Sequence, residues 1–213
     1  MGLLEKRTFN FEVLADENDA GEKIISGRPI VYNSRTDMGM FDEIIDAGAL
    51  DKTDLTDVRF LVNHNTDMIP LARSRRNNGN STMKITPDAQ GLNMDFVKLD
   101  VENNSDARAL YSAIKRGDIS GMSFMFYVDG ESWENLESEH PTRHITNIGS
   151  VVEVSAVTFP AYESTEIYAR SNAAALENAA TVLEKARAEL RAASLDNDEL
   201  ALLKAKTKIL GGF

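Results

Sequence analysis

The spacing of apolar residues changes near residue 170, and this change most constrains how the chain can fold. Over residues 1–170, short runs either alternate apolar and polar residues or are continuously apolar, with Gly, Pro, Asn and Asp between them. Such runs are typical of strands joined by turns. From residue 171 onward, Ala, Leu, Glu, Lys and Arg dominate, as they do in helices. The sequence therefore predicts a strand-rich domain over residues 1–170 and a helical tail over residues 171–213.

The first part is predicted to be an α+β domain. One helix is expected to begin at Ser105 and to end at Gly117, because Ala107, Leu110 and Ile114 recur at helical spacing between a capping residue and a glycine. The predicted strands cover residues 9–13, 24–32, 41–45, 58–64, 84–86, 92–99, 119–128 and 148–159. So many short strands with one helix predict a small β-barrel-like domain with helices packed outside it.

The tail carries a seven-residue repeat of small and branched apolar residues. The members of the repeat are Leu176, Leu183 and Leu190 together with Ala179, Ala186 and Ala193. This is the spacing of a helix that buries one narrow face, either against its own domain or against a partner or a second copy of the chain. A capping box at Asp196 and Glu199 then predicts a second helix that ends at Gly211.

Composition excludes several classes of function. The net charge of the 213-residue chain is −11, which does not suit a protein that binds nucleic acid, because phosphates require clustered Lys and Arg. The chain has no cysteine, so it has no disulfide, no thiolate metal site and no cysteine nucleophile. We also expect no signal peptide and no membrane span, because no apolar run approaches about 18–20 residues.

Three residues on predicted strands have the chemistry of an acyl-transfer triad. Ser123 lies on the face of its strand opposite to a face of apolar residues, and His64 ends a strand and enters a loop. Glu153 interrupts an apolar strand, where a carboxylate needs a hydrogen-bonding partner such as a histidine or an arginine. A serine, a histidine and a carboxylate that converge form a nucleophile, a base and an orienting group. Strand patterns alone do not show that they converge, and each residue taken alone suits a structural role as well.

Five blocks of the sequence resemble the HK97-type phage prohead protease family, and they occur in the family's order over about residues 5–168. The blocks cover residues 27–32, 46–50, 61–73, 121–126 and 153–162. The last block, Glu-Val-Ser-Ala-Val-Thr-Phe-Pro-Ala-Tyr, is the most specific of them. Two positions depart from the family pattern, since Ala72 and Met125 stand where the family usually has glycine. Met125 lies two residues from Ser123 on the same strand face, so we expect it to affect substrate specificity.

The resemblance implies a herpesvirus-assemblin-like fold and a serine endopeptidase that acts inside the assembling procapsid, in the cytoplasm of the host cell. Such an enzyme cleaves the scaffolding (delta) region of the major capsid protein and then itself, and needs no cofactor or metal. The resemblance makes Ser123 the nucleophile, His64 the base and Glu153 the third member. His144 is the alternative third member, because the related herpesvirus enzymes use a second histidine. The helical tail is then expected to bind the scaffold helices of the capsid protein or to be removed on maturation, and self-association is expected.

Two other functions are compatible with parts of the sequence. The first is a capsid scaffolding or assembly protein that has the same fold but no activity, which the acidic charge and the tail suit equally well. The second is a metal-dependent hydrolase that uses His64, His140 and His144. It is disfavoured because these histidines lack metal-ligand spacing and are not grouped with carboxylates.

Overall fold

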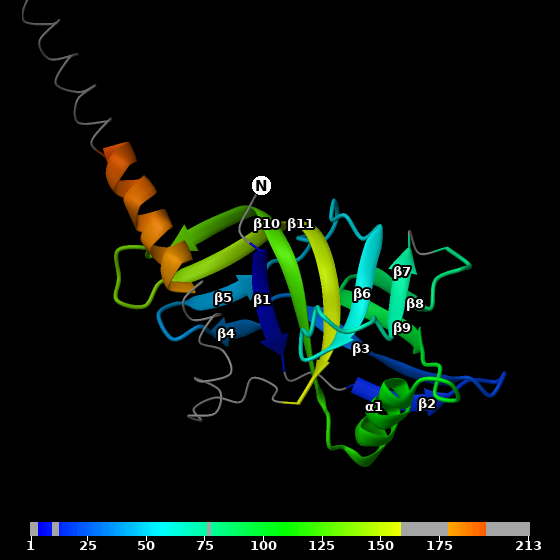
Figure 1. Cartoon of the computed structure of the whole chain (residues 1–213). Helices are drawn as coiled ribbons and strands as arrows, with labels where there is room; N and C mark the ends of the chain where they lie inside the picture. The colour runs from blue at the N-terminus through cyan, green and yellow to red at the C-terminus, as the bar shows by residue number, and fades with distance from the viewer. Residues whose placement is uncertain (1–3, 10–12, 76–77, 159–178, 195–213) are drawn as a thin grey trace, which may run out of the picture.

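The computed structural model of the chain describes residues 4–9, 13–75, 78–158 and 179–194. Its strands form two sheets, with helix α1 (Ser105–Arg116) against β2 and β3 and a second helix over residues 179–194 (Figure 1). The strands are β1 (Leu4–Phe9), β2 (Val13–Glu17), β3 (Lys23–Val31), β4 (Arg35–Asp37), β5 (Asp42–Ile45), β6 (Asp57–Val62), β7 (Ala72–Arg75), β8 (Met83–Asp88), β9 (Gly91–Lys98), β10 (Gly121–Glu134) and β11 (Thr142–Val157).

The larger sheet is built around the antiparallel pair of β10 and β11. Its order is β1-β10-β11-β5-β4, and β6 also pairs with β11 and then with β7. The 16-residue strand β11 pairs in parallel with β5 through its first residues and with β6 through its last residues. The end of β6 therefore lies beside residues 153–156, and β1 is an edge strand on the far side of β10.

The smaller sheet is antiparallel, in the order β2-β3-β9-β8. The main hydrophobic core joins both sheets and α1, with fully buried side chains such as Ile25 and Leu92 from the smaller sheet and Phe60 and Phe124 from the larger one. The predicted α+β class is confirmed. The predicted barrel is wrong, because among the described residues the two sheets meet through these side chains and no hydrogen-bonded seam closes them.

Several predicted elements are confirmed, with shifted ends. Helix α1 begins at Ser105, but its capping residue is Asn104 and not Ser105, because the side chain of Asn104 accepts hydrogen bonds from the N–H groups of the first turn. Gly117 ends α1 in the left-handed conformation, with a φ of 79°. The predicted strand 9–13 is divided between β1 and β2, and residues 10–12 lie outside the described residues. The rest of β1 and of β2, and the whole of β4 and β7, were not predicted.

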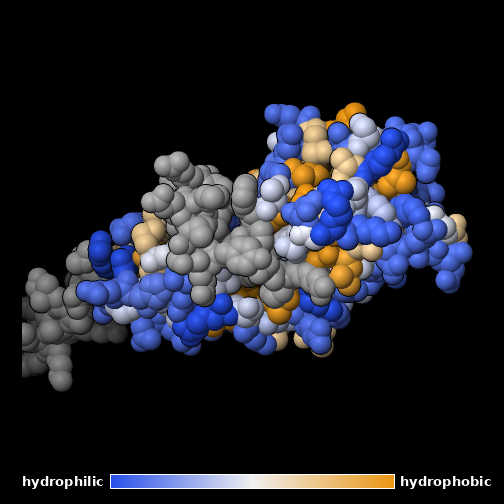
Figure 2. Space-filling view, turned by 90° about the horizontal axis from the view of Figure 1, so that it is seen from below, coloured by the Kyte–Doolittle hydropathy of each residue, from blue (hydrophilic) through white to orange (hydrophobic). Residues whose placement is uncertain are grey.

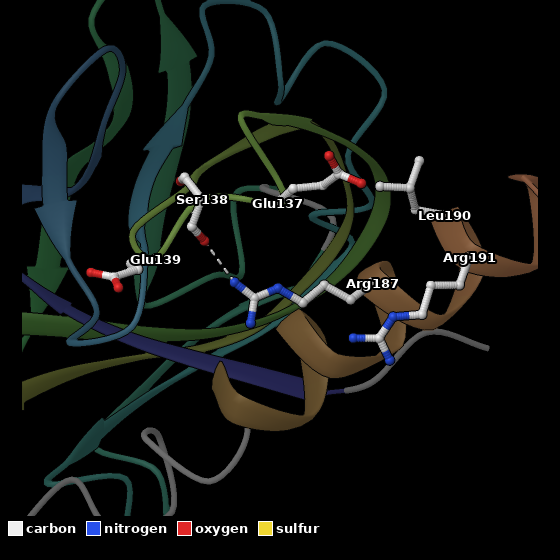
Figure 3. Close-up of a pocket in the computed structure, with 6 residues that line it drawn as sticks. All are labelled: Glu137, Ser138, Glu139, Arg187, Leu190 and Arg191. Carbon is white, nitrogen blue, oxygen red and sulfur yellow. Dashed lines mark hydrogen bonds between the residues drawn. The ribbon is translucent and has the colours of Figure 1, made fainter.

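The helix over residues 179–194 packs against the domain through its first turns. Ala179 and Leu183 are buried in a small cluster with Met38 and Phe41, whereas Leu190 is 42% exposed. Figure 3 shows Arg187 directed at the loop between β10 and β11, where it donates to the carbonyls of residues 136 and 138 at 3.2 and 2.8 Å. Leu176, the second predicted helix and the predicted domain boundary lie outside the described residues.

One face of the molecule agrees with the polar composition. Figure 2 shows a face on which hydrophilic residues surround smaller hydrophobic patches. None of the helices that the structure describes is both long enough and apolar enough to cross a membrane.

Candidate active site

Ser123 lies on β10 with a strand hydrogen-bonded on each side. It faces Ser155 of β11 in one direction and Thr8 of β1 in the other. Its neighbours Met122 and Phe124 point into the core and are fully buried, as the strand alternation predicted. Ser123 is therefore held on a rigid part of the sheet, on the face opposite to the core side chains.

His64 lies in a tight turn that follows β6. Asn63 and His64 both have left-handed backbone conformations, with φ values of 51° and 57°. Such values are uncommon for residues other than glycine and occur often at functional sites. The turn is fastened to the end of β11, because the Asn63 side chain bonds to Thr158 at two 2.9 Å contacts and the His64 N–H donates to Ser155 Oγ at 3.1 Å.

The three side chains form a continuous chain of hydrogen bonds. His64 Nε2 lies 2.6 Å from Ser123 Oγ, and His64 Nδ1 lies 2.5 Å from Glu153 Oε1. Glu153 is 1% exposed, and its second oxygen accepts a hydrogen bond from Ser155 Oγ at 2.5 Å. Because both carboxylate oxygens have partners, burial of this charge is compensated.

This arrangement has the geometry that acyl transfer needs. A hydroxyl within hydrogen-bond reach of an imidazole nitrogen can pass its proton to that nitrogen as it attacks a carbonyl carbon. A carboxylate on the other ring nitrogen holds the imidazole in the required tautomer and stabilises its protonated form. Ser123, His64 and Glu153 stand in these three positions, and the sheet holds them there before any substrate binds.

The other two histidines lie away from Ser123. His144 Nδ1 bonds to Asp46 Oδ1 at 2.8 Å, nine residues before Glu153 on the same strand β11. His140 is 43% exposed and bonds to Asp42 at 3.2 Å. Of the two candidates for the third position, only Glu153 contacts His64.

Two other groups of residues could be taken for sites. Asp37, Asp42 and His140 bring three possible ligand atoms within 4.8 Å of one another, but Asp42 already pairs with Arg35 and with His140. A pocket between the second helix and the loop of residues 137–139 includes none of the three triad side chains (Figure 3). Neither group adds to the chemistry of Ser123.

Ser155 and the N-terminal strand are parts of the site that the sequence reasoning missed. Ser155 follows Glu153 by two residues on one strand, so the alternation of side chains already places the two on one face. No comparable pattern in the sequence indicated that β1 contacts Ser123. Its Thr8 Oγ1 lies 2.9 Å from Ser123 Oγ, and the Ser123 hydroxyl also donates to the backbone carbonyl of Arg7 at 2.5 Å.

A buried cluster of charges fixes β1 behind the site. Arg7 bonds to Glu43 at 2.5 and 2.6 Å and to Glu5 at 2.5 Å, and Arg143 bonds to Glu5 and Glu43 at 2.7–2.9 Å and also to Glu131. Burial alone would lower the pKa of Arg7 and of Arg143, but the carboxylates outweigh it and both pKa values are raised. Burial alone would raise the pKa of Glu5, but Arg143 and Arg7 lower it.

The two positions that depart from the family pattern lie in different places. Ala72 is buried on β7 opposite Phe60 of β6. Met125 is half-buried on β10, between Lys6 of β1 and Glu153 of β11, on the same face as Ser123.

The sequence model of a family described as caudovirus prohead serine protease matches residues 9–179. The chain belongs to this family. The prohead protease match spans His64, Ser123 and Glu153 and starts at the last residue of β1. No curated protein and no solved structure matches the chain. Membership of the prohead protease family therefore suggests that the hydrogen-bonded residues Ser123, His64 and Glu153 belong to a capsid maturation protease.

Proposed function

We propose that this prohead protease family member is a serine endopeptidase that cleaves the scaffolding region of the major capsid protein, and itself, inside the maturing procapsid. The observation that carries the proposal is the chain of hydrogen bonds from Ser123 through His64 to Glu153. Ser123 is the nucleophile, His64 is the base that takes and returns its proton, and Glu153 orients His64. Backbone N–H groups are the expected donors to the oxyanion.

The test is co-expression with the cognate capsid protein, followed by measurement of intact masses. The wild-type chain is expected to remove a defined fragment from the capsid protein, and Ser123→Ala is expected to leave the capsid protein whole. Ser132→Ala is the matched control, because Ser132 lies on the same strand β10 but is exposed. Equal capsid masses for wild type and Ser123→Ala would contradict the proposal.

One observation favours a second function, that of an inactive scaffolding or assembly protein with the same fold. Ser123 is 0% exposed, and its Oγ contacts Thr8 and the Arg7 carbonyl of β1, so a substrate has no access to it in this arrangement. The scaffolding function predicts that Ser123→Ala changes neither the capsid protein masses nor the yield of procapsids. The protease function predicts loss of processing with normal assembly.

A further inference from the structure

The strand β1 lies where a substrate of Ser123 would have to lie. In the register of β1 and β10, Thr8 faces Ser123, and the Arg7 carbonyl accepts the Ser123 hydroxyl at 2.5 Å. Since a C=O bond is about 1.23 Å long, the Arg7 carbonyl carbon is within about 3.7 Å of Ser123 Oγ. Reacting atoms are about 3–3.5 Å apart in a conformation ready for attack. The peptide bond from Arg7 to Thr8 therefore occupies nearly the position of a bond to be cleaved.

The hydrogen bond from Ser123 to the Arg7 carbonyl also keeps Ser123 from reacting. A serine hydroxyl has one proton, and this proton can go either to the Arg7 carbonyl or to His64 Nε2, which lies 2.6 Å away. When the proton is donated to Arg7, His64 does not accept it, and Oγ is directed at the carbonyl oxygen instead of the carbon. The Thr8 hydroxyl is a further hydrogen-bonding neighbour of Oγ, at 2.9 Å. As long as β1 is in place, it both covers Ser123 and competes for its proton.

The way in which β1 is held allows another strand to replace it. None of its described side chains belongs to the main hydrophobic core, and its inward side chains are the charged Glu5 and Arg7. Buried ion pairs contribute little net stability compared with apolar packing of the same volume. β1 is also an edge strand, and an edge can exchange one extended segment for another. The family match starts only at its last residue.

We propose that β1 is an inhibitory strand, and that the substrate binds in its place as an extended peptide, antiparallel to β10, with a basic residue at the position of Arg7. This inference rests on the proposed protease function. The preference for a basic residue follows from the charges that remain when β1 leaves. Glu43 and Glu131 stay beside Arg143, so the cavity vacated by Arg7 has a net charge of −1, with Glu43 as the direct partner of the incoming cation.

A reversible disulfide between β1 and β10 tests whether β1 has to be displaced before Ser123 can react. Leu4 and Tyr127 face each other across β1 and β10, four pairs away from Ser123, and the chain has no cysteine of its own. Facing residues of antiparallel strands have Cα atoms about 4.5–5.5 Å apart, within the range for a disulfide. We expect the oxidised L4C/Y127C double variant to cleave the capsid protein at least tenfold more slowly than wild type. It should also resist labelling of Ser123 by a fluorophosphonate, and a reducing agent should restore both activities.

The control is a double-cysteine variant whose disulfide lies in the smaller sheet. E17C/K23C joins facing residues of β2 and β3 in the smaller sheet, and its oxidation is expected to change neither rate. If oxidised L4C/Y127C cleaves and labels as fast as its reduced form, the inference is wrong while the protease function stands. If the wild type and both reduced variants neither cleave nor label at Ser123, the proposed function itself fails.

A second measurement tests the proposed preference for a basic substrate residue at the position of Arg7. Peptides that differ only at the residue before the cut, Arg against Leu, are compared in the wild type and in Glu43→Gln. The wild type is expected to prefer Arg by at least tenfold in kcat/KM, and in Glu43→Gln the ratio of the Arg rate to the Leu rate is expected to fall toward one. The ratio is compared, and not the single rates, because Glu43 also bonds to Arg7 and holds β1. A general loss of folding would lower both rates together. An unchanged preference in Glu43→Gln, or no preference in the wild type, would overturn this part.

Discussion

Glu153 and His144 lie on the same strand, and only Glu153 contacts His64. Glu153→Gln keeps the shape of the side chain but can hold His64 in the wrong tautomer, with the proton on Nε2. We expect kcat for peptide cleavage to fall by about 10⁴, the scale of the corresponding change in other serine proteases. His144→Gln, which removes a bond to Asp46 and none to the triad, is expected to leave kcat within about twofold of wild type. The reverse pattern would make His144 the third member.

Ser155 forms hydrogen bonds both with the Glu153 carboxylate and with the turn that carries His64. Its hydroxyl donates to Glu153 and accepts the N–H of His64, and it is fully buried. We expect Ser155→Ala to lower the free energy of unfolding by about 1–3 kcal/mol, because a buried carboxylate oxygen loses its donor.

Ser155→Ala is also expected to lower kcat by about tenfold to a hundredfold at nearly constant KM, because the triad shifts while the substrate site does not. Steady-state kinetics and urea unfolding measure the two effects. Ser150→Ala, at a half-buried serine of the same strand, should change kcat little. A loss of stability with unchanged kcat would limit Ser155 to a structural role.

At the scale of the element, the attachment of β1 depends on pH through its buried carboxylate. The pKa of Glu5 lies below its usual value of 4.5, because Arg143 and Arg7 outweigh the effect of burial. A lowered folded-state pKa means that the stabilisation is complete above 4.5 and is lost as pH falls through the folded-state pKa. Acid is therefore expected to loosen β1.

Urea unfolding of Glu5→Gln measures this contribution. At neutral pH, the variant is expected to be less stable than wild type by about 3–5 kcal/mol, because the buried arginines lose a carboxylate partner. The difference should shrink as pH falls below 4.5 and should be lost once pH is below the lowered pKa of Glu5, where Glu5 of the folded wild type is itself protonated. Glu102→Gln, at an exposed carboxylate, should match wild type at every pH. A difference that stays constant with pH would contradict the pKa argument.

The same strand shows why sequence patterns predicted some elements and missed others. Strands such as β6 and β10 bury apolar residues at alternate positions, so their faces could be predicted, and with them the side on which Ser123 lies. In β1 the buried positions are Glu5 and Arg7, which a hydropathy pattern assigns to the surface. Their burial depends on partners at positions 43 and 143, far away in the sequence. Convergence of the triad likewise depends on the parallel pairing of β6 with β11, which no local pattern encodes.

At the scale of the whole molecule, the helix over residues 179–194 has buried first turns and more exposed last turns. The first turns bury Ala179 and Leu183 against Met38 and Phe41, and the repeat then continues to Leu190, which is 42% exposed. Packing on its own domain, one of the two uses considered for the seven-residue repeat, therefore involves the first turns of the helix. Binding of a partner, the other use, stays a prediction and would fall to the exposed turns around Leu190.

A pair of matched substitutions separates these uses. Leu183→Ala is expected to lower the free energy of unfolding by about 2–5 kcal/mol, because it empties a buried position, whereas Leu190→Ala should change it by less than about 0.5 kcal/mol. If the exposed turns bind the scaffold helices of the capsid protein, Leu190→Glu incorporates poorly into procapsids although it folds and cleaves free peptides normally. Quantitative mass spectrometry of purified procapsids gives the incorporated amount per capsid protein. Normal incorporation of Leu190→Glu would exclude this turn as the packaging contact and leave the helix with its role on the domain, because an exposed leucine alone does not define an interface.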